Sequence, residues 1–389
     1  MTAAEPDGRG RPGAPTLGVL TVGQLVRLCG IAGLGPADAS AYATVLVEAL
    51  GPVAERPLDL PPLHRTFLSD DHTPVEYSLS FVPDGTPPTL RVLLEPGHAA
   101  GGNLARNGRL GLQAVRDMAL RWNISTDRLA DLEDLFFPSA PHGPLALWCA
   151  LELRPGGVPR MKVYLNPAAR GENRSAETVR EALRRLGHRR AFASLPAADG
   201  FPFVALDLGD WESPRVKVYA RHDGLAVAEA PALCRMDPGP GAAEVEQFLR
   251  TAAGLGPDPF GTGVRQADAP ARITGRPVLT CHSFTETDGE GPSGFTLHVP
   301  VRGYARHDGE ALDRAAALLH HYGMDATALL RAPAAITARR PEDGVGLLAY
   351  LALAHQHGRP PRVTAYLSAE AYGVHPARAP QPTGVTTAG

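Results

Sequence analysis

The sequence has few cysteines, few aromatic residues and no long apolar run. Its four cysteines in 389 residues are far apart and form no Cys-x-x-Cys pair: Cys29, Cys149, Cys234 and Cys281. This spacing argues against zinc and disulfide frameworks and is typical of buried thiols in a reducing cytoplasm. No apolar stretch reaches the roughly 18–20 residues that span a bilayer, and residues 1–15 lack a signal-peptide pattern. We therefore expect a cytoplasmic protein without membrane contacts.

Several motifs of phosphate and metal chemistry are also missing. The pairs Asp70-Asp71 and Asp131…Asp134 do not give the Asp-Asp-x-x-Asp spacing that holds magnesium on a diphosphate. There is no Gly-x-x-x-x-Gly-Lys-Ser/Thr loop, no Gly-x-Ser-x-Gly turn and no His-Glu-x-x-His pair. The formal net charge is −3, whereas nucleic-acid-binding proteins normally carry a broad basic surface. We expect no metal site, no required cofactor and no nucleic-acid partner.

What the sequence does contain is one short segment in three near copies. Residues 160–165 read Arg-Met-Lys-Val-Tyr-Leu, residues 215–220 read Arg-Val-Lys-Val-Tyr-Ala, and residues 362–367 read Arg-Val-Thr-Ala-Tyr-Leu. Successive side chains of a β-strand point to opposite faces, so cations and tyrosines share one face and aliphatic side chains the other. The repeat therefore predicts a sheet with one buried apolar face and one basic, tyrosine-bearing face.

The predicted elements alternate as strand, strand, helix. Strands are expected at 72–83, 89–95, 145–154, 161–166, 203–207, 215–220, 279–284, 294–301 and 362–367, and helices at 21–34, 103–122, 175–186, 242–255, 308–322 and 343–357. Strands joined by short turns are antiparallel, and closing about ten of them removes the sheet edges and leaves a ligand-sized interior. We predict an α+β barrel of about ten antiparallel strands around a solvent-filled lumen, with an outer ring of helices. It would form one domain at 17–373, between disordered tails at 1–16 and 374–389.

The inward face would hold five cations, namely Arg91, Lys162, Arg215, Lys217 and Arg362. They suit a diphosphate, because arginine binds phosphate oxygens bidentately and lysine supplies a point charge. Tyr164, Tyr219 and Tyr366 lie between them in sequence and could stabilise a carbocation through their ring faces. The alternatives are a solvated polar face on an open sheet, or a tyrosine-bearing sheet that stacks single-stranded nucleic acid.

A lone carboxylate, Glu76, belongs to the same face. It could accept a polar N–H of a second substrate, or it could instead pair with a neighbouring cation. Trp148, Thr296 and His298 are the remaining inward candidates for the acceptor pocket and for proton transfer.

Three segments carry a family resemblance: Thr-Pro-Val-Glu-Tyr-Ser at 73–78, Met-Lys-Val-Tyr-Leu-Asn-Pro at 161–167 and Arg-Val-Lys-Val-Tyr at 215–219. They resemble the dimethylallyl tryptophan synthase family of aromatic prenyltransferases, most of all its bacterial tryptophan members, over residues 21–372. The resemblance implies the ABBA barrel, dimethylallyl diphosphate as donor, an indole such as L-tryptophan as acceptor, no need for Mg²⁺, and a place in secondary (alkaloid) metabolism. It also implies the site roles: Glu76 accepts the indole N–H; Arg91, Lys162, Arg215 and Lys217 bind diphosphate; and Tyr164, Tyr219 and Tyr366 shield the allyl cation.

The sequence departs from the fungal pattern at two places. Where fungal members have Asp-Leu-Lys, this chain has Glu152-Leu153-Arg154, and arginine is a poor base. The arenium proton acceptor therefore stays open among Glu76, Glu152, His298 and the released diphosphate, and Arg154 is kept as a catalytic candidate. Thr296-Leu297-His298 replaces the fungal Gln-x-Tyr. The attacked benzene carbon (C5 or C6), a different acceptor (cyclic dipeptide, tryptophan-containing peptide or phenol) and a monomeric or homodimeric state also stay open.

Overall fold

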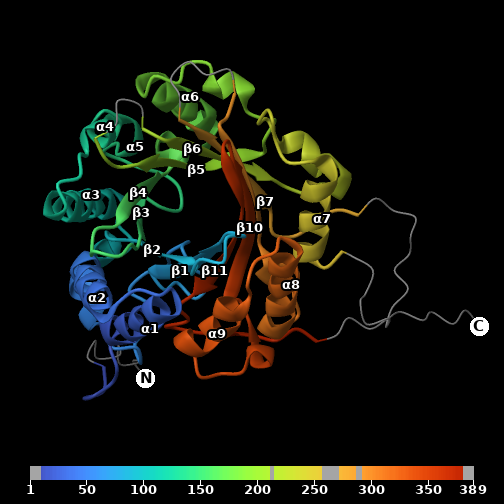
Figure 1. Ribbon diagram of the computed structural model, residues 1–389. Coiled ribbons are helices and arrows are strands. Elements are labelled where there is room, and N and C mark those ends of the chain that lie inside the picture. Colours follow the sequence, from blue (N-terminus) through green and yellow to red (C-terminus); the bar gives the residue numbers. More distant parts are fainter. Residues whose placement is uncertain (1–9, 211–213, 256–270, 286–290, 380–389) are drawn as a thin grey trace, which may run out of the picture.

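The computed structural model describes residues 10–210, 214–255, 271–285 and 291–379 (Figure 1). Residues 1–9 and 380–389 of the predicted tails lie outside this range. Within the other tail residues, His375–Pro376 forms the short strand β12, which pairs with β9 (Gly344–Val345).

Ten strands form one closed antiparallel barrel in the order β1-β11-β10-β8-β7-β6-β5-β4-β3-β2. They are β1 (Val75–Phe81), β2 (Thr89–Leu94), β3 (Leu147–Glu152), β4 (Arg160–Leu165), β5 (Gly200–Asp207), β6 (Val216–His222), β7 (Val278–Phe284), β8 (Gly294–Val299), β10 (Leu348–Gln356) and β11 (Arg359–Ser368). β1, the first strand, pairs with β11, so no edge of this sheet is left open. The predicted ten-stranded barrel is confirmed.

Alternation along each strand separates the two faces of the barrel wall. In β4, Met161, Val163 and Leu165 are buried in the main apolar core, whereas Lys162 and Tyr164 point to the other face. The aliphatic face packs under the helices, and its burial is the main favourable term for closing the barrel. The polar face lines the lumen.

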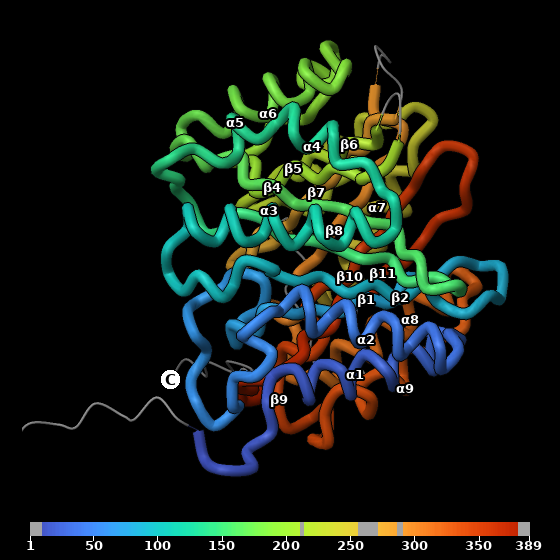
Figure 2. Tube along the Cα trace, turned by 90° about the vertical axis from the view of Figure 1, so that its left-hand side faces the viewer, coloured from blue at the N-terminus to red at the C-terminus, as the bar shows by residue number. Residues whose placement is uncertain are grey.

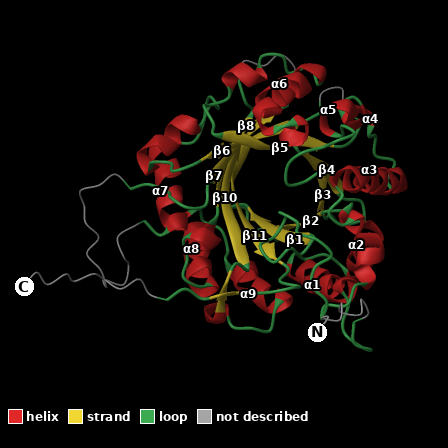
Figure 3. Cartoon of the chain, turned by 180° about the vertical axis from the view of Figure 1, so that it is seen from behind, coloured by secondary structure: helices red, strands yellow, loops and turns green. Residues whose placement is uncertain are grey.

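The helices form a ring outside the strands (Figure 3). They are α1 (Leu17–Ile31), α2 (Pro36–Leu50), α3 (Leu104–Arg121), α4 (Asp127–Ala130), α5 (Glu133–Phe136), α6 (Ser175–Arg185), α7 (Ala242–Ala253), α8 (Asp308–His321) and α9 (Thr327–Ile336). Side-chain N-caps precede α1 and α3: Thr16 accepts a hydrogen bond from the backbone of Val19, and Asn103 from that of Arg106. Figures 1 and 2 both place α1, α2 and α3 on the outside of the barrel wall.

One predicted element is wrong and several elements were not predicted. Residues 343–357 were expected to be a helix, but they contain β10, which pairs with β8 and β11. The segment Leu-Ala-Tyr-Leu-Ala-Leu-Ala is rich in helix formers, and nearly all of it is buried, so the period-2 pattern of a strand is hidden. The helices α2, α4, α5 and α9 and the two-residue strands β9 and β12 were not predicted.

Candidate active site

Five cations gather at one end of the lumen, and strand register explains how. Arg91 is directly opposite Glu152, and Lys162 is opposite both Ala150 and Asp207. The guanidinium of Arg91 donates to one Glu152 oxygen from Nε (3.0 Å) and Nη2 (2.8 Å). Asp207 lies 3.3 Å from Lys162 Nζ and 2.6 Å from Arg215 Nη2.

Lys217 and Arg362 complete this cation layer without a carboxylate partner among the described residues. Burial, and then the charge of Lys162, holds the pKa of Lys217 well below its usual range. Burial and the charge of Arg91 lower the pKa of Arg362 to about 10. The layer therefore carries five cations against two carboxylates, Glu152 and Asp207. A bound anion would relieve the repulsion between the cations.

A cavity of about 210 Å³ opens at this end and reaches both unpaired cations. Lys217, Arg362, Ser283 and Thr296 line it, together with Arg359 and other residues of the β10–β11 turn. Two of the five predicted diphosphate residues, Lys217 and Arg362, thus line an accessible space, and Arg91, Lys162 and Arg215 are not among its lining residues.

Aromatic rings form a belt next to the cation layer. Tyr164 and Tyr219 have ring centroids 5.9 Å apart, and Tyr219 lies 5.5 Å from the ring of His298. His298 in turn lies 5.9 Å from the ring of Tyr366, with its Nε2 at 3.3 Å from the tyrosine hydroxyl. Burial, then the charge of Lys217, lowers the pKa of His298 to about 3, so its imidazole is neutral.

Glu76 is on β1, which pairs directly with β11, the strand that carries Tyr366 of this belt. It is opposite Leu93 and Ser368, two residue pairs beyond the pair of Ser78 and Tyr366, and is 7% exposed. Burial raises the pKa of Glu76 to about 8, against the charge of Arg302, which favours the ionised form. The site therefore offers one buried hydrogen-bonding carboxyl at its second end.

The other predicted residues are more dispersed. Trp148 is buried and packs on Phe203 at 5.0 Å, with an indole N–H that has no hydrogen-bond partner among the described residues. Thr296 is in the cavity wall near the cations. Arg154 is exposed just beyond the end of β3, where its backbone bonds to the Tyr42 hydroxyl, and its catalytic role stays a prediction.

Four residues of the lumen were not identified from the sequence. Phe203 and Asp207 were on a predicted strand, and the alternation of that strand could have placed both beside the cations. Tyr350 contacts the ring of Tyr366 at 6.3 Å but fell in the segment taken for a helix. Arg302 lies in a 3₁₀ turn after β8, for which no periodic signal exists.

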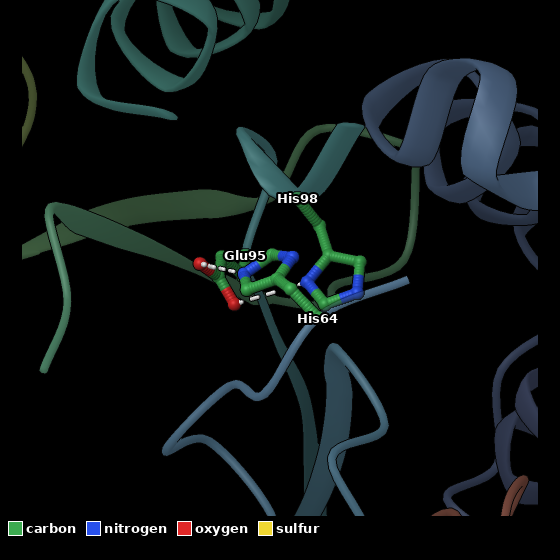
Figure 4. Close-up of side chains that lie close together, drawn as sticks. All are labelled: His64, Glu95 and His98. Carbon is green, nitrogen blue, oxygen red and sulfur yellow. Dashed lines mark hydrogen bonds and ion pairs between the residues drawn. The ribbon is translucent and has the colours of Figure 1, made fainter. Parts of the chain in front are cut away.

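One further cluster, at the end of β2, brings together His64, Glu95 and His98 (Figure 4). The carboxylate of Glu95 lies 3.6 Å from His64 Nε2 and 3.3 Å from His98 Nδ1, and Asn107 donates to it at 2.6 Å. Metal-bound histidines usually donate their second N–H to a partner. Here His64 Nδ1 and His98 Nε2 have none among the described residues, and the two rings stack at 4.0 Å. These features fit a hydrogen-bonded network around Glu95 better than a set of metal ligands.

The fold is a closed antiparallel barrel with helices outside it. Its lumen has a cationic end, an aromatic belt and a buried carboxyl. Together these features define an aromatic prenyltransferase of the ABBA type. Residues 39–329 match the family model of tryptophan dimethylallyltransferases. The chain belongs to this family.

Solved structures of related enzymes cover almost the whole chain. The ternary complex of the prenyltransferase PriB with L-tryptophan and dimethylallyl thiolodiphosphate is 62% identical, with TM-score 0.89, covering 94% of this chain and 100% of that one. The 5-dimethylallyl tryptophan synthase of Streptomyces coelicolor, in complex with DMASPP and Trp, is 62% identical, with TM-score 0.86 and 95% and 100% coverage. The 6-dimethylallyltryptophan synthase of Micromonospora olivasterospora, in complex with DMASPP and Trp, is 40% identical, with TM-score 0.82 and 93% and 99% coverage. No helix within the described residues is both long and apolar enough to cross a membrane.

Proposed function

We propose that this chain transfers a dimethylallyl group from dimethylallyl diphosphate to a benzene-ring carbon, C5 or C6, of L-tryptophan. The observation that carries the proposal is the division of one lumen into a cation layer and a buried carboxyl, with aromatic rings between them. The related enzymes crystallised with tryptophan and thio analogues of the donor support the same pair of substrates.

The first step breaks the C–O bond of the donor, and the electron pair leaves with the diphosphate. Arg91, Lys162, Arg215, Lys217 and Arg362 would stabilise the charge that develops on the leaving group. They are already in position before the reaction, so little reorganisation is needed. The allyl cation forms beside the faces of Tyr164, Tyr219 and Tyr366, which exclude water and stabilise positive charge by about 0.5–2 kcal/mol per ring.

The second step forms a bond between the allyl cation and the ring carbon that faces it. Glu76 accepts the indole N–H and so fixes the ring, and this orientation selects the carbon that reacts. The ring carbon then loses its proton to a base. Glu152 is a poor base. Burial raises its pKa, but the charge and hydrogen bonds of Arg91 and the charges of Arg160 and Lys162 together outweigh burial and lower the pKa to about 2. The neutral imidazole of His298 and the departing diphosphate are the acceptors that the lumen offers.

We further propose that the reaction needs no divalent metal. The five lumen cations would neutralise the diphosphate as aspartate-bound Mg²⁺ does in metal-dependent prenyl transfer, and the acidic pair Asp70-Asp71 is engaged elsewhere. Asp70 pairs with Arg276 and Arg302, and Asp71 binds the Ser69 and Thr73 hydroxyls and the backbone of Tyr372. We also propose a cytoplasmic location, which the four free thiols support.

The test is an incubation of the purified protein with dimethylallyl diphosphate and L-tryptophan, with and without EDTA, read by mass spectrometry. A product heavier by one C5 unit in both samples is expected, and NMR then identifies the substituted carbon. Activity that is lost in EDTA and restored by Mg²⁺ would contradict metal independence. Intact substrates in both samples would contradict the acceptor assignment, and the cyclic dipeptides and phenols left open above would then be screened.

A further inference from the structure

A single carboxylate, that of Asp207, contacts two cations of the layer. Asp207 ends β5 and is opposite Lys162 of β4, and its backbone N–H donates to the carbonyl of Arg215 at 3.1 Å. Its Oδ2 accepts from Arg215 Nε at 2.8 Å, and its Oδ1 lies 3.3 Å from Lys162 Nζ. Each carboxylate oxygen therefore faces one cation. None of the roles assigned above uses this carboxylate.

Both cations keep donors for a second anion. The ion pair of Lys162 with Asp207 lacks hydrogen-bond geometry, because the buried Oδ1 has no hydrogen-bond partner among the described residues. The three N–H donors of the ammonium are thus not committed to it. Arg215 uses Nε and Nη2 on Asp207, whereas its Nη1 makes only a long contact of 3.5 Å with Gln356. A diphosphate can therefore bind both cations while Asp207 stays in place.

The Asp207 side chain keeps its negative charge in the empty site. Burial raises its pKa, but the charges of Lys162, Arg215 and Lys217 outweigh burial and hold the pKa below its usual range. The side chain is only 17% exposed, so solvent screens its charge weakly. A diphosphate on the same cations lies near a fixed negative charge that repels it.

Glu152, the other carboxylate of the layer, is placed differently. Its Oε2 accepts two hydrogen bonds from Arg91, but its Oε1 lies 3.6 Å from Arg160, which is 51% exposed and outside the layer. Part of its charge therefore neutralises a surface residue. Asp207 has both of its ion-pair partners inside the layer, so it is the carboxylate that opposes a bound diphosphate more directly.

The reaction gives such an anion a use. Negative charge accumulates on the leaving group as the C–O bond breaks, so a site that stabilises this charge also favours the diphosphate product. Slow product release limits kcat in many enzymes. A carboxylate inside the layer aligns the cations before the donor arrives and weakens their hold on the product afterwards.

We propose that Asp207 positions Lys162 and Arg215 in the empty site, repels the diphosphate product, and so sets the rate at which this product leaves. It is a positioning residue, and no bond to it forms or breaks. The part of this inference that concerns turnover rests on the proposed function. The part that concerns affinity needs only a diphosphate.

The binding experiment compares Asp207→Asn with Asp84→Asn by calorimetric titration with inorganic diphosphate. Asparagine has nearly the same shape and can still accept from Arg215, so the first variant removes the charge with little change in geometry. Asp84 also lines the cavity, but it is exposed and accepts from Thr86 instead of a cation. Asp207→Asn should bind diphosphate at least about tenfold more tightly than the wild type, and Asp84→Asn should stay within about twofold.

The kinetic experiment separates release from chemistry. Rapid-quench measurements with dimethylallyl diphosphate and L-tryptophan should show a first-turnover burst of prenylated product in Asp207→Asn, followed by a slower steady state. The value of kcat falls because release is slower, whereas the rate of the first turnover is retained. A merely structural role would instead slow the first turnover and weaken diphosphate binding.

Three results would overturn the proposal. Unchanged or weaker diphosphate binding in Asp207→Asn would show that Asp207 does not oppose the product. An equal gain in Asp84→Asn would indicate a general charge effect, and tighter binding without slower turnover would exclude a role in release. If Asp207→Asn does not fold, Asp207→Ser removes the same charge and should give the same gain.

The outcomes also separate this inference from the proposed function. If the wild type prenylates no indole, the proposed function is wrong, and the calorimetric comparison still tests the effect of Asp207 on diphosphate affinity. If the wild type prenylates L-tryptophan and Asp207→Asn binds diphosphate no more tightly, the proposed function stands and the role of Asp207 is wrong.

Discussion

The two ends of the lumen are built from the same alternating strands but carry opposite kinds of ionisable group. At the donor end, five cations are held against two carboxylates, and Lys217 and Arg362 have depressed pKa values because of burial and their charged neighbours. At the acceptor end, one carboxyl, Glu76, is buried with a raised pKa. The first end is arranged to receive a multiply charged anion, and the second to accept a neutral N–H.

The largest effect is expected from Lys217→Met at the donor end. It removes a buried cation that lines the cavity, and we expect donor affinity to fall by about 10²-fold, because a charge-assisted contact of this kind contributes about 3 kcal/mol. The melting temperature without donor should stay the same or rise, since burial of this amino group, which lowers its pKa, is unfavourable in the free protein. Calorimetric titration with diphosphate and thermal unfolding measure the two quantities. A large fall in melting temperature would contradict this account of the cation layer.

The donor end should also take up protons. A bound diphosphate favours the charged form of Lys217, whose pKa is depressed in the free protein, so binding should draw a proton from solution and weaken as pH rises. Calorimetric titrations in buffers of different ionisation enthalpy measure this uptake. Lys217→Met is the control and should show a smaller uptake; equal uptake in both proteins would assign the proton to another group.

The acceptor end should respond to Glu76→Gln with a smaller loss. We expect kcat/KM for L-tryptophan to fall about 10- to 100-fold, the range for a hydrogen bond to a charged group, while diphosphate affinity is unchanged. Steady-state kinetics with each substrate varied in turn provide the measurement. Near-normal turnover would contradict the role of Glu76, and a matching loss of diphosphate affinity would contradict the separation of the two ends.

The titration of Glu76 should make both acceptor kinetics and stability depend on pH. Its pKa is raised from 4.5 to about 8, so kcat/KM for the acceptor should rise as the carboxyl ionises near pH 8. For stability the sign is opposite: the folded state keeps a proton that the unfolded state has lost, so the free energy of unfolding falls as pH rises from about 4.5 to 8. The fall attributable to this group is at most about 5 kcal/mol. Glu76→Gln should flatten both profiles; unchanged profiles would mean that another group titrates.

The smallest effect on catalysis is expected from the network at the end of β2. His98→Leu leaves the buried Glu95 without one partner and should lower the free energy of unfolding by about 2–3 kcal/mol. Burial alone would raise the pKa of Glu95, but His64 and His98 outweigh it and lower the pKa to about 2. Its stabilisation is therefore present above about pH 4.5 and is lost as pH falls toward 2. Chemical denaturation measures the change; a loss of donor affinity in the same variant would link this network to the cation layer.

Much of the barrel and of the site could be predicted from local patterns. The period-2 alternation in 160–165 and 215–220 fixes which side chains face the lumen, because neighbouring residues of a strand must point to opposite sides. Residues 348–356 could not be assigned in this way. Both faces of that strand are buried, so hydrophobicity does not alternate, and only pairing with β8 and β11 selects the strand.

By itself, the sequence determined the strand faces, and with them the cations, the tyrosines and Glu76 as lumen residues. Only the tertiary structure decided which of them meet and what surrounds them. Asp207 becomes a partner of Lys162 through strand register, and Arg302 reaches the vicinity of Glu76 from a turn more than 200 residues later in the chain. Burial and charge proximity, which set the pKa values of Glu76 and Lys217, arise from these long-range contacts, and no local pattern encodes them.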